Sequence, residues 1–213
     1  MDKFCERKTI NNKISQPVNA LSAISLLIVA ILVIVTKNTI VLTPLFKKLF
    51  AITLSFMAIT TFLAHKNPTN KFLGRLDIYS MIIFVNFIIL ANITIIRKIS
   101  DKQLLLLFLA LTILSTILFK YLNLSIFIIL MLILIVSFTS IIFSNKLIKK
   151  DIYIYTSGIV FLVALIVWKY SKTGQKLCNP SSLIQGHAIW HILCAISIFL
   201  MLKFYQSIEF MSE

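Results

Sequence analysis

The feature that most constrains this chain is a succession of long apolar runs, each bordered by charged residues. Each run is about 16 to 25 residues long, which is enough for a helix to cross a hydrocarbon core of roughly 30 Å. Backbone groups in lipid have no water to bond, so the runs are expected to be helices. We therefore predict an all-α integral membrane protein, with residues 1–213 forming a single domain of seven transmembrane helices. The spans lie near residues 17–36, 46–65, 77–96, 103–119, 122–144, 152–169 and 183–204.

Composition supports this class. Hydrophobic residues make up 59% of the chain and charged residues only 13%, too few charges to cover a water-soluble fold. The net charge of +14 would suggest a nucleic-acid partner in a soluble protein. Here the Lys and Arg residues lie between the apolar runs, as expected for side chains that reach lipid headgroups, so no nucleic-acid partner is expected. These cations divide eleven to ten between the two membrane faces, so charge does not predict the orientation.

All three histidines of the chain lie at ends of apolar runs. His65 ends the second run, and His187 and His191 lie near the start of the seventh. A spacing of four residues places His187 and His191 on one helical face, and counting the spans brings His65 to the same side of the membrane. Ionisable groups at this depth are costly and are usually functional. We predict that the three histidines bind one metal ion; the alternative is that each is an interfacial residue with its own polar partner.

Three neutral imidazoles suit Zn²⁺ and leave a fourth position for a water molecule, whose pKa would fall to about 7. Asp77, at the start of the third run, is expected to orient a histidine or to act as general base. The hydroxyl of Thr61, one helical turn before His65, is expected to donate to an oxyanion. Alternatively, Asp77 is the N-cap of a helix. The alternative for Thr61 is that its hydroxyl bonds to its own helix.

Six short motifs follow one another along the chain: Cys5-Glu6-Arg7, Pro17-x-Asn19-x-x-Ser22, Thr61-x-x-x-His65, Asp77, Cys178 and His187-x-x-x-His191. In this order they resemble the alkaline ceramidase family. That family belongs to the CREST superfamily of seven-span hydrolases, which has the adiponectin receptors as distant relatives. The resemblance covers nearly the whole chain and is closest to compact bacterial ceramidase-domain membrane proteins.

The resemblance implies a zinc site formed by His65, His187 and His191, with Thr61 in place of the family's Ser and Asp77 as the acid/base residue. The implied reaction is hydrolysis of ceramide or a similar N-acyl lipid to a fatty acid and a long-chain amine by metal-bound hydroxide. The resemblance also implies a possible disulfide between Cys5 and Cys178. Such a bond would place the N-terminus on a periplasmic or lumenal side and the C-terminus in the cytoplasm.

Members of the family that bind Ca²⁺ do so through acidic and Asn residues near the N-terminus. In this chain Lys3, Lys8 and Gln16 replace three of those residues, and only Glu6 remains. Lysine cannot ligate a hard cation, so a Ca²⁺ site is not expected. Glu6 is instead expected to pair with a nearby Lys or Arg, or to remain a solvated charge.

Two other functions are compatible with a helical membrane protein. The distant resemblance to the adiponectin receptors keeps open a seven-span lipid-binding receptor in which the zinc site is structural. A transporter is disfavoured, because no span is interrupted by Gly-Pro breaks and no internal repeat is evident. A related lipid hydrolase that cleaves an ester would use the same attack.

Overall fold

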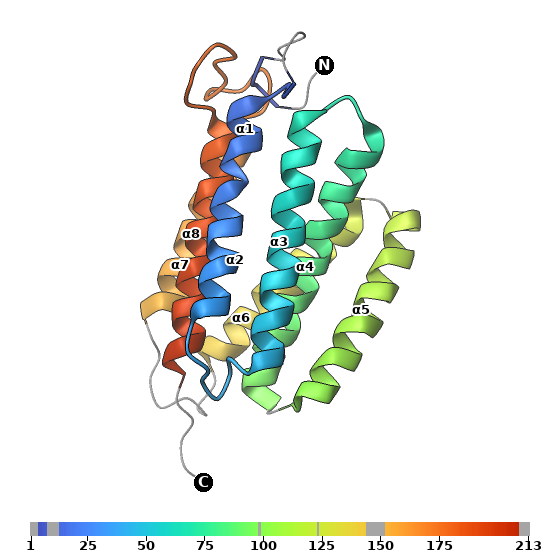
Figure 1. Cartoon of the computed structure of the whole chain (residues 1–213), viewed down its shortest axis with the longest axis vertical. Coiled ribbons are helices and arrows are strands. Elements are labelled where there is room, and N and C mark those ends of the chain that lie inside the picture. Colours follow the sequence, from blue (N-terminus) through green and yellow to red (C-terminus); the bar gives the residue numbers. More distant parts are fainter. Residues whose placement is uncertain (1–3, 8–12, 98, 123, 144–151, 209–213) are drawn as a thin grey trace.

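The structure, a computed structural model, describes residues 4–7, 13–97, 99–122, 124–143 and 152–208. These residues form eight α-helices and no β-strand, which confirms the all-α class (Figure 1). Apart from α6, the helices run side by side roughly along the long axis of the molecule. They are α1 (Pro17–Ser22), α2 (Ile24–Val35), α3 (Pro44–Lys66), α4 (Lys71–Arg97), α5 (Asp101–Leu122), α6 (Leu124–Ile142), α7 (Ile152–Tyr170) and α8 (Gly186–Ser207).

Six helical segments among the described residues are long and apolar enough to cross a membrane. The first combines α1 and α2, which are separated only at Ala23, and the others are α3, α4, α5, α7 and α8. Within α6, the apolar helical segment Ile128–Ile142 is shorter than a full span. The chain is therefore a multi-pass helical membrane protein by length and composition, and a seventh span remains a prediction.

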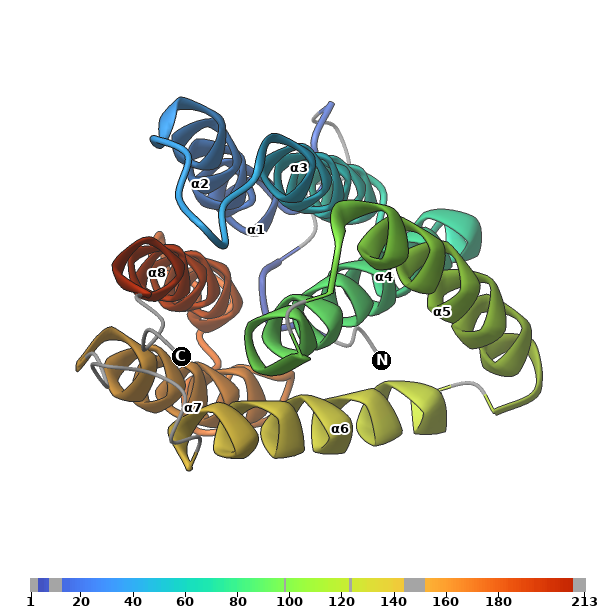
Figure 2. The same ribbon diagram turned by 90° about the horizontal axis from the view of Figure 1, so that it is seen from below.

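The centre of the bundle is α4, which packs against α3, α5 and α6. On the other side α8 packs against α7, α1 and α2 (Figure 2). Figure 2 looks along the bundle. In this view α6 lies across the picture, because it runs obliquely from α5 to α7. α3 ends and α8 begins at the same end of the bundle, where α1 also begins (Figure 1).

One predicted boundary is wrong in a way that affects the site. α4 begins at Lys71 rather than near residue 77, because the side chain of Asn70 accepts hydrogen bonds from the backbone N–H groups of Phe72 and Leu73. This cap satisfies donors that the first helical turn leaves without partners. Asp77 therefore lies in the second turn of α4 and is not its N-cap. Charged residues in these first turns made the run look shorter than the helix.

The other boundaries differ from the predicted ones by a few residues. α3 starts at Pro44, where the Thr43 hydroxyl accepts from Phe46 N and so caps the helix. The last helix starts at Gly186 and continues to Ser207. The boundary between the fourth and fifth runs falls between Leu122 and Leu124.

An aromatic and polar cluster closes the bundle at the end away from the histidines. Tyr205 is fully buried, and its ring lies 5.5 Å from that of Phe46. The Tyr205 hydroxyl donates to Asn92 Oδ1 at 2.7 Å, and Asn92 Nδ2 donates to Ser137 Oγ at 2.9 Å. These two bonds link α8, α4 and α6 inside the apolar core, where unpaired polar groups would be costly.

Candidate metal centre

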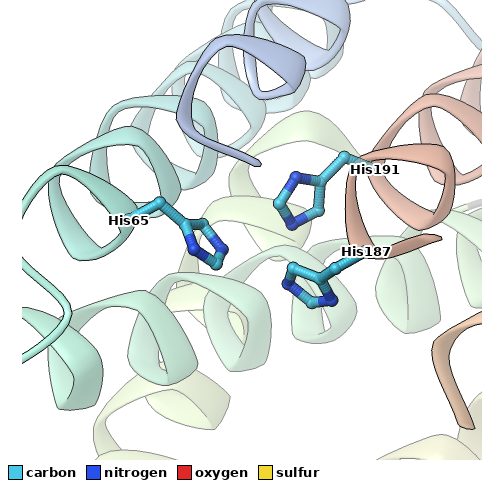
Figure 3. Close-up of side chains that lie close together, drawn as sticks. All are labelled: His65, His187 and His191. Carbon is cyan, nitrogen blue, oxygen red and sulfur yellow. The ribbon is translucent and has the colours of Figure 1, made fainter. Parts of the chain in front are cut away.

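The three histidines meet at one end of the bundle. His65 comes from the last turn of α3, and His187 and His191 come from the first two turns of α8 (Figure 3). One ring nitrogen of each lies within 4.8 Å of those of the other two, and all three side chains are buried. The structure thus brings together the set that the count of spans predicted.

The start of α8 is set by close packing against the end of α7. A β-carbon added at Gly186 would lie 2.7 Å from Ser171 Cβ, closer than real contacts allow. Glycine therefore lets the first turn of α8 approach Ser171, and the next residue, His187, takes a buried position at this end of the bundle. No sequence pattern marked Gly186 as part of the site, although it directly precedes a predicted ligand.

A short N-terminal segment, Phe4–Arg7, lies over the histidines and is named here the N-terminal strap. It is joined to the loop between α7 and α8 by a disulfide between Cys5 and Cys178, by a backbone bridge from Phe4 to Lys172, and by a hydrogen bond from Arg7 N to Pro180 O. The disulfide implied by the resemblance is therefore present. Cys194, within α8, is a half-buried thiol outside the disulfide.

Phe4 is the residue of the strap that covers the site. Its ring stacks on that of His187, with centroids 3.8 Å apart and planes 25° apart, and it lies 5.3 Å from the ring of His65. An aromatic ring in this position excludes water from one side of the histidine cluster. Sequence reasoning missed Phe4, because only the tertiary fold brings it to residues that are far away in the chain.

Glu6 forms no ion pair with a described Lys or Arg, and it is not a solvated charge, so the second of the two expectations for it is wrong. Its side chain is buried, and its two carboxylate oxygens accept from Val18 N at 2.8 Å and Asn19 N at 2.9 Å. These N–H groups belong to the first turn of α1, where the helix has no other acceptors for them. Glu6 thus caps α1. Lys3 and Lys8 lie outside the described residues.

Two residues at the start of the first span contact the histidines directly, and sequence reasoning did not assign them this role. Gln16 Oε1 lies 2.8 Å from His65 Nδ1, and Ser22 Oγ lies 2.7 Å from His191 Nδ1. Both polar residues are followed by apolar sequence. A spacing of six residues does not place two side chains on one helical face, so no local sequence pattern identifies Gln16 and Ser22.

Thr61 and Asp77 form a pair beside the histidines. The Thr61 hydroxyl donates to Asp77 Oδ1 at 2.6 Å, linking α3 to α4. Thr61 is buried and lies one turn before His65, so both side chains project from the same face of α3. The alternative in which Thr61 bonds only to its own helix is wrong, since its hydroxyl is directed to Asp77.

The histidine cluster offers three nitrogen donors that could hold a metal ion. Imidazole nitrogens are favoured zinc ligands, and three of them leave the fourth tetrahedral position open. Zn–N bonds of about 2.05 Å place tetrahedral ligand atoms about 3.3 Å apart. The nitrogens, at most 4.8 Å apart, need only small side-chain movements to reach that spacing. His65, His187 and His191 therefore fit a metal ion.

A groove of about 640 Å³ lies between α4 and α5, lined in part by Arg75, Tyr79 and Lys120. None of the three histidines lines it. The groove is therefore separate from the histidine cluster and does not provide a direct opening to it.

No protein-family model matches this chain, and no curated protein sequence matches it.

Proposed function

We propose that this protein is a zinc-dependent intramembrane lipid amidase that hydrolyses ceramide or a similar N-acyl lipid to a fatty acid and a long-chain amine. The observation that carries the proposal is the convergence of three buried histidines from α3 and α8, with the Thr61–Asp77 pair beside them. This combines a metal-binding donor set with a hydroxyl and a carboxylate suited to acid–base chemistry. The motifs that resemble alkaline ceramidases support the choice of an amide.

His65, His187 and His191 would hold the zinc ion. A bound Zn²⁺ would supply a water molecule with its pKa lowered to about 7 and would polarise the substrate carbonyl. Asp77 would take a proton from the attacking water and later deliver it to the leaving nitrogen. Thr61 would donate to the carbonyl oxygen as negative charge develops there.

The bond between Thr61 and Asp77 couples these two roles. The Thr61 hydroxyl has one proton, and it donates that proton to Asp77 Oδ1. When Asp77 takes a proton from water, its carboxyl group becomes neutral and accepts less strongly. The Thr61 hydroxyl can then turn to the substrate oxygen. Water adds to the carbonyl carbon, the C–N bond breaks, and the proton on Asp77 passes to the amine.

A lipid substrate suits the surroundings of the site. The histidines lie at one end of a bundle whose helices expose many large apolar side chains, as expected for contact with lipid. A substrate that stays in the bilayer could bring its polar linkage to this depth while its chains remain between or beside the helices.

We also propose that the chain crosses the membrane seven times, with α6 as the fifth crossing. α3 ends where α8 begins, so an even number of crossings must lie between them. α4, α5 and α7 supply three, and the oblique α6 would supply the fourth. The Cys5–Cys178 disulfide supports an oxidising compartment at the histidine end, hence a periplasmic or lumenal N-terminus and a cytoplasmic C-terminus.

The test combines metal analysis with an activity measurement on the detergent-purified chain. We expect about one zinc per chain and release of fatty acid from a fluorescent ceramide, both lost in His187→Ala. Asp77→Asn is the informative companion, because it should keep the metal and the fold and lose turnover. Full turnover after zinc removal would contradict the proposal.

One observation favours a second candidate, a lipid-binding receptor-like protein with a structural zinc site. Phe4 and the N-terminal strap cover the histidines, as is common for closed structural sites. In that case His187→Ala would lose expression and thermal stability together. Asp77→Asn would change neither, and no N-acyl lipid would be cleaved.

A further inference from the structure

We infer that Gln16 and Ser22 are positioning residues that hold the ring proton of His65 and His191 on Nδ1, so that Nε2 of both rings is available to the metal. This rests on the proposed zinc site and extends it to residues outside the ligand set. A histidine can ligate a metal only through a nitrogen that carries no proton. Fixing the tautomer before the metal arrives therefore favours binding.

The hydrogen bonds of Gln16 determine the tautomer of His65. Gln16 Nε2 donates to the backbone oxygen of Glu6 at 3.3 Å, which fixes the orientation of the amide group. The opposite orientation would place two acceptor oxygens against each other. Gln16 Oε1 therefore faces His65 Nδ1 at 2.8 Å, and because this oxygen can only accept, Nδ1 must carry the proton.

The hydrogen bonds of Ser22 give the same result for His191. The Ser22 hydroxyl donates its single proton to the backbone oxygen of Asn19 at 2.7 Å. Towards His191 Nδ1, 2.7 Å away, Ser22 Oγ can then act only as an acceptor. His191 Nδ1 must donate, and Nε2 keeps its lone pair.

α1 is held in place by bonds that do not involve the rings. Ser15 N and Gln16 N donate to the carbonyl oxygens of Lys66 and His65 at the end of α3. At the same time, the Glu6 carboxylate caps the first turn of α1. These contacts hold the start of α1 against the end of α3 and against the N-terminal strap. The two acceptor residues, Gln16 and Ser22, are thus held in place by contacts other than those with the histidine rings.

The test measures zinc affinity of the full-length, detergent-purified protein by competition with a chromophoric chelator. Gln16→Leu and Ser22→Ala each remove one acceptor. We expect zinc to bind about 10- to 100-fold more weakly in each, the usual effect of losing a partner of a ligating histidine. Melting temperature and elution volume report whether each variant is folded.

Two further variants separate this role from general effects on folding. Gln16→Glu keeps an acceptor oxygen and is expected to keep zinc affinity. Ser25 makes the same kind of bond as Ser22, from its hydroxyl to the carbonyl oxygen three residues before it, but it contacts no histidine. Ser25→Ala therefore reproduces the loss of a helix bond, and its zinc affinity should equal that of the wild type.

A second readout does not depend on the metal. The chain has three histidines, so protein labelled with ¹⁵N-histidine gives a simple nitrogen spectrum. In the metal-free wild type we expect two rings with a protonated Nδ1 and an unprotonated Nε2. Gln16→Leu and Ser22→Ala should each change the tautomer of one ring. The inference is overturned if both folded variants keep the wild-type spectrum or bind zinc within about threefold of wild type, short of the expected loss.

The two proposals fail in different ways. If the wild type binds zinc and cleaves the lipid but neither acceptor matters, only the positioning role is wrong. If the acceptors govern zinc affinity but no N-acyl lipid is cleaved, the amidase proposal is wrong and the support of the metal site stands. A wild type that binds no zinc overturns both.

Discussion

The Thr61 hydroxyl donates to Asp77 Oδ1 at 2.6 Å, one helical turn from His65. This bond leads to a prediction that separates chemistry from metal binding. Thr61→Ala should lower kcat by about 10²- to 10³-fold, as expected for the loss of an oxyanion donor, while zinc content is unchanged. Thr61→Ser keeps the hydroxyl and should retain most activity. Hydrolysis of a fluorescent ceramide under saturating conditions measures both.

The matched control is Thr53, a second buried threonine on α3 whose hydroxyl bonds only to its own helix, at the carbonyl oxygens of Leu49 and Phe50. Thr53→Ala should leave kcat unchanged. Equal losses in the two variants would show that Thr61 acts through stability and not at the reacting carbonyl.

Gly186→Ala should weaken the metal site from outside it. The new β-carbon would meet Ser171 Cβ at 2.7 Å, so the first turn of α8 must move away and carry His187 with it. We expect a stability loss of about 1–3 kcal/mol, typical of overpacking, together with weaker zinc binding. Unfolding experiments and chelator competition measure these two effects.

Gly158→Ala is the control for this steric clash, since a β-carbon added at Gly158 would have no neighbouring atom within 4 Å. Adding Ser171→Gly to Gly186→Ala removes the opposing β-carbon and should restore part of the zinc affinity. If Gly186→Ala binds zinc as the wild type does, close packing at this point does not set the position of His187.

The Cys5–Cys178 disulfide should be detectable by counting thiols. Of the three cysteines, only Cys194 should react with an alkylating reagent in the unfolded, unreduced protein, and all three should react after reduction. Replacing Cys5 and Cys178 by Ser should cost about 2–5 kcal/mol of stability. Mass spectrometry gives the count, and Cys194→Ser should change stability little. Three reactive thiols before reduction would show that the bond is absent.

Removing the Phe4 ring should open the histidine cluster to solvent. Phe4→Ala loses a stacked contact with His187, and such pairs contribute about 0.5–1.5 kcal/mol. We expect a chelator to remove zinc several-fold faster, with modest loss of stability. Stopped-flow chelation measures the rate. Phe72, an exposed aromatic residue on α4, provides a control in Phe72→Ala, whose rate should match that of the wild type.

Tyr205→Phe tests the other end of the bundle. It removes the bond from the Tyr205 hydroxyl to Asn92 Oδ1 and leaves a buried acceptor with one partner fewer. Bonds between membrane helices contribute about 0.6 kcal/mol on average and up to about 1.7. We expect a stability loss in this range with zinc affinity unchanged. A loss of zinc in this variant would mean that the two ends of the bundle are coupled.

Much of the fold follows from the sequence because lipid permits few alternatives. Charged residues between the apolar runs marked the spans, and the run containing His65 could be connected to the run of His187 by counting. The start of α4 could not be found in this way, since Lys71, Arg75 and Asp77 lie within helical turns. A rule based on charge-free runs cannot recognise such turns.

The three histidines and the neighbouring Thr61 and Asp77 could be predicted from the sequence, but the residues that contact the histidines could not. His65, His187 and His191 stand out because imidazoles are rare in this chain and two share a helical spacing. Gln16 and Ser22 are ordinary polar residues until the fold places each against a ring nitrogen. Glu6 caps a helix that begins eleven residues later, a contact that no local pattern encodes. Such partners depend on tertiary packing and are therefore not visible in the sequence alone.

The disulfide also bears on how the protein is made. It joins the fifth residue of the chain to a loop that precedes the last helix, and that helix supplies two of the three histidines. No nascent chain that lacks α8 can contain the complete histidine cluster, however much of the bundle has already inserted. Assembly of the site must therefore wait until α8 has been synthesised, whereas both cysteines that fasten the covering strap are already present before α8 begins.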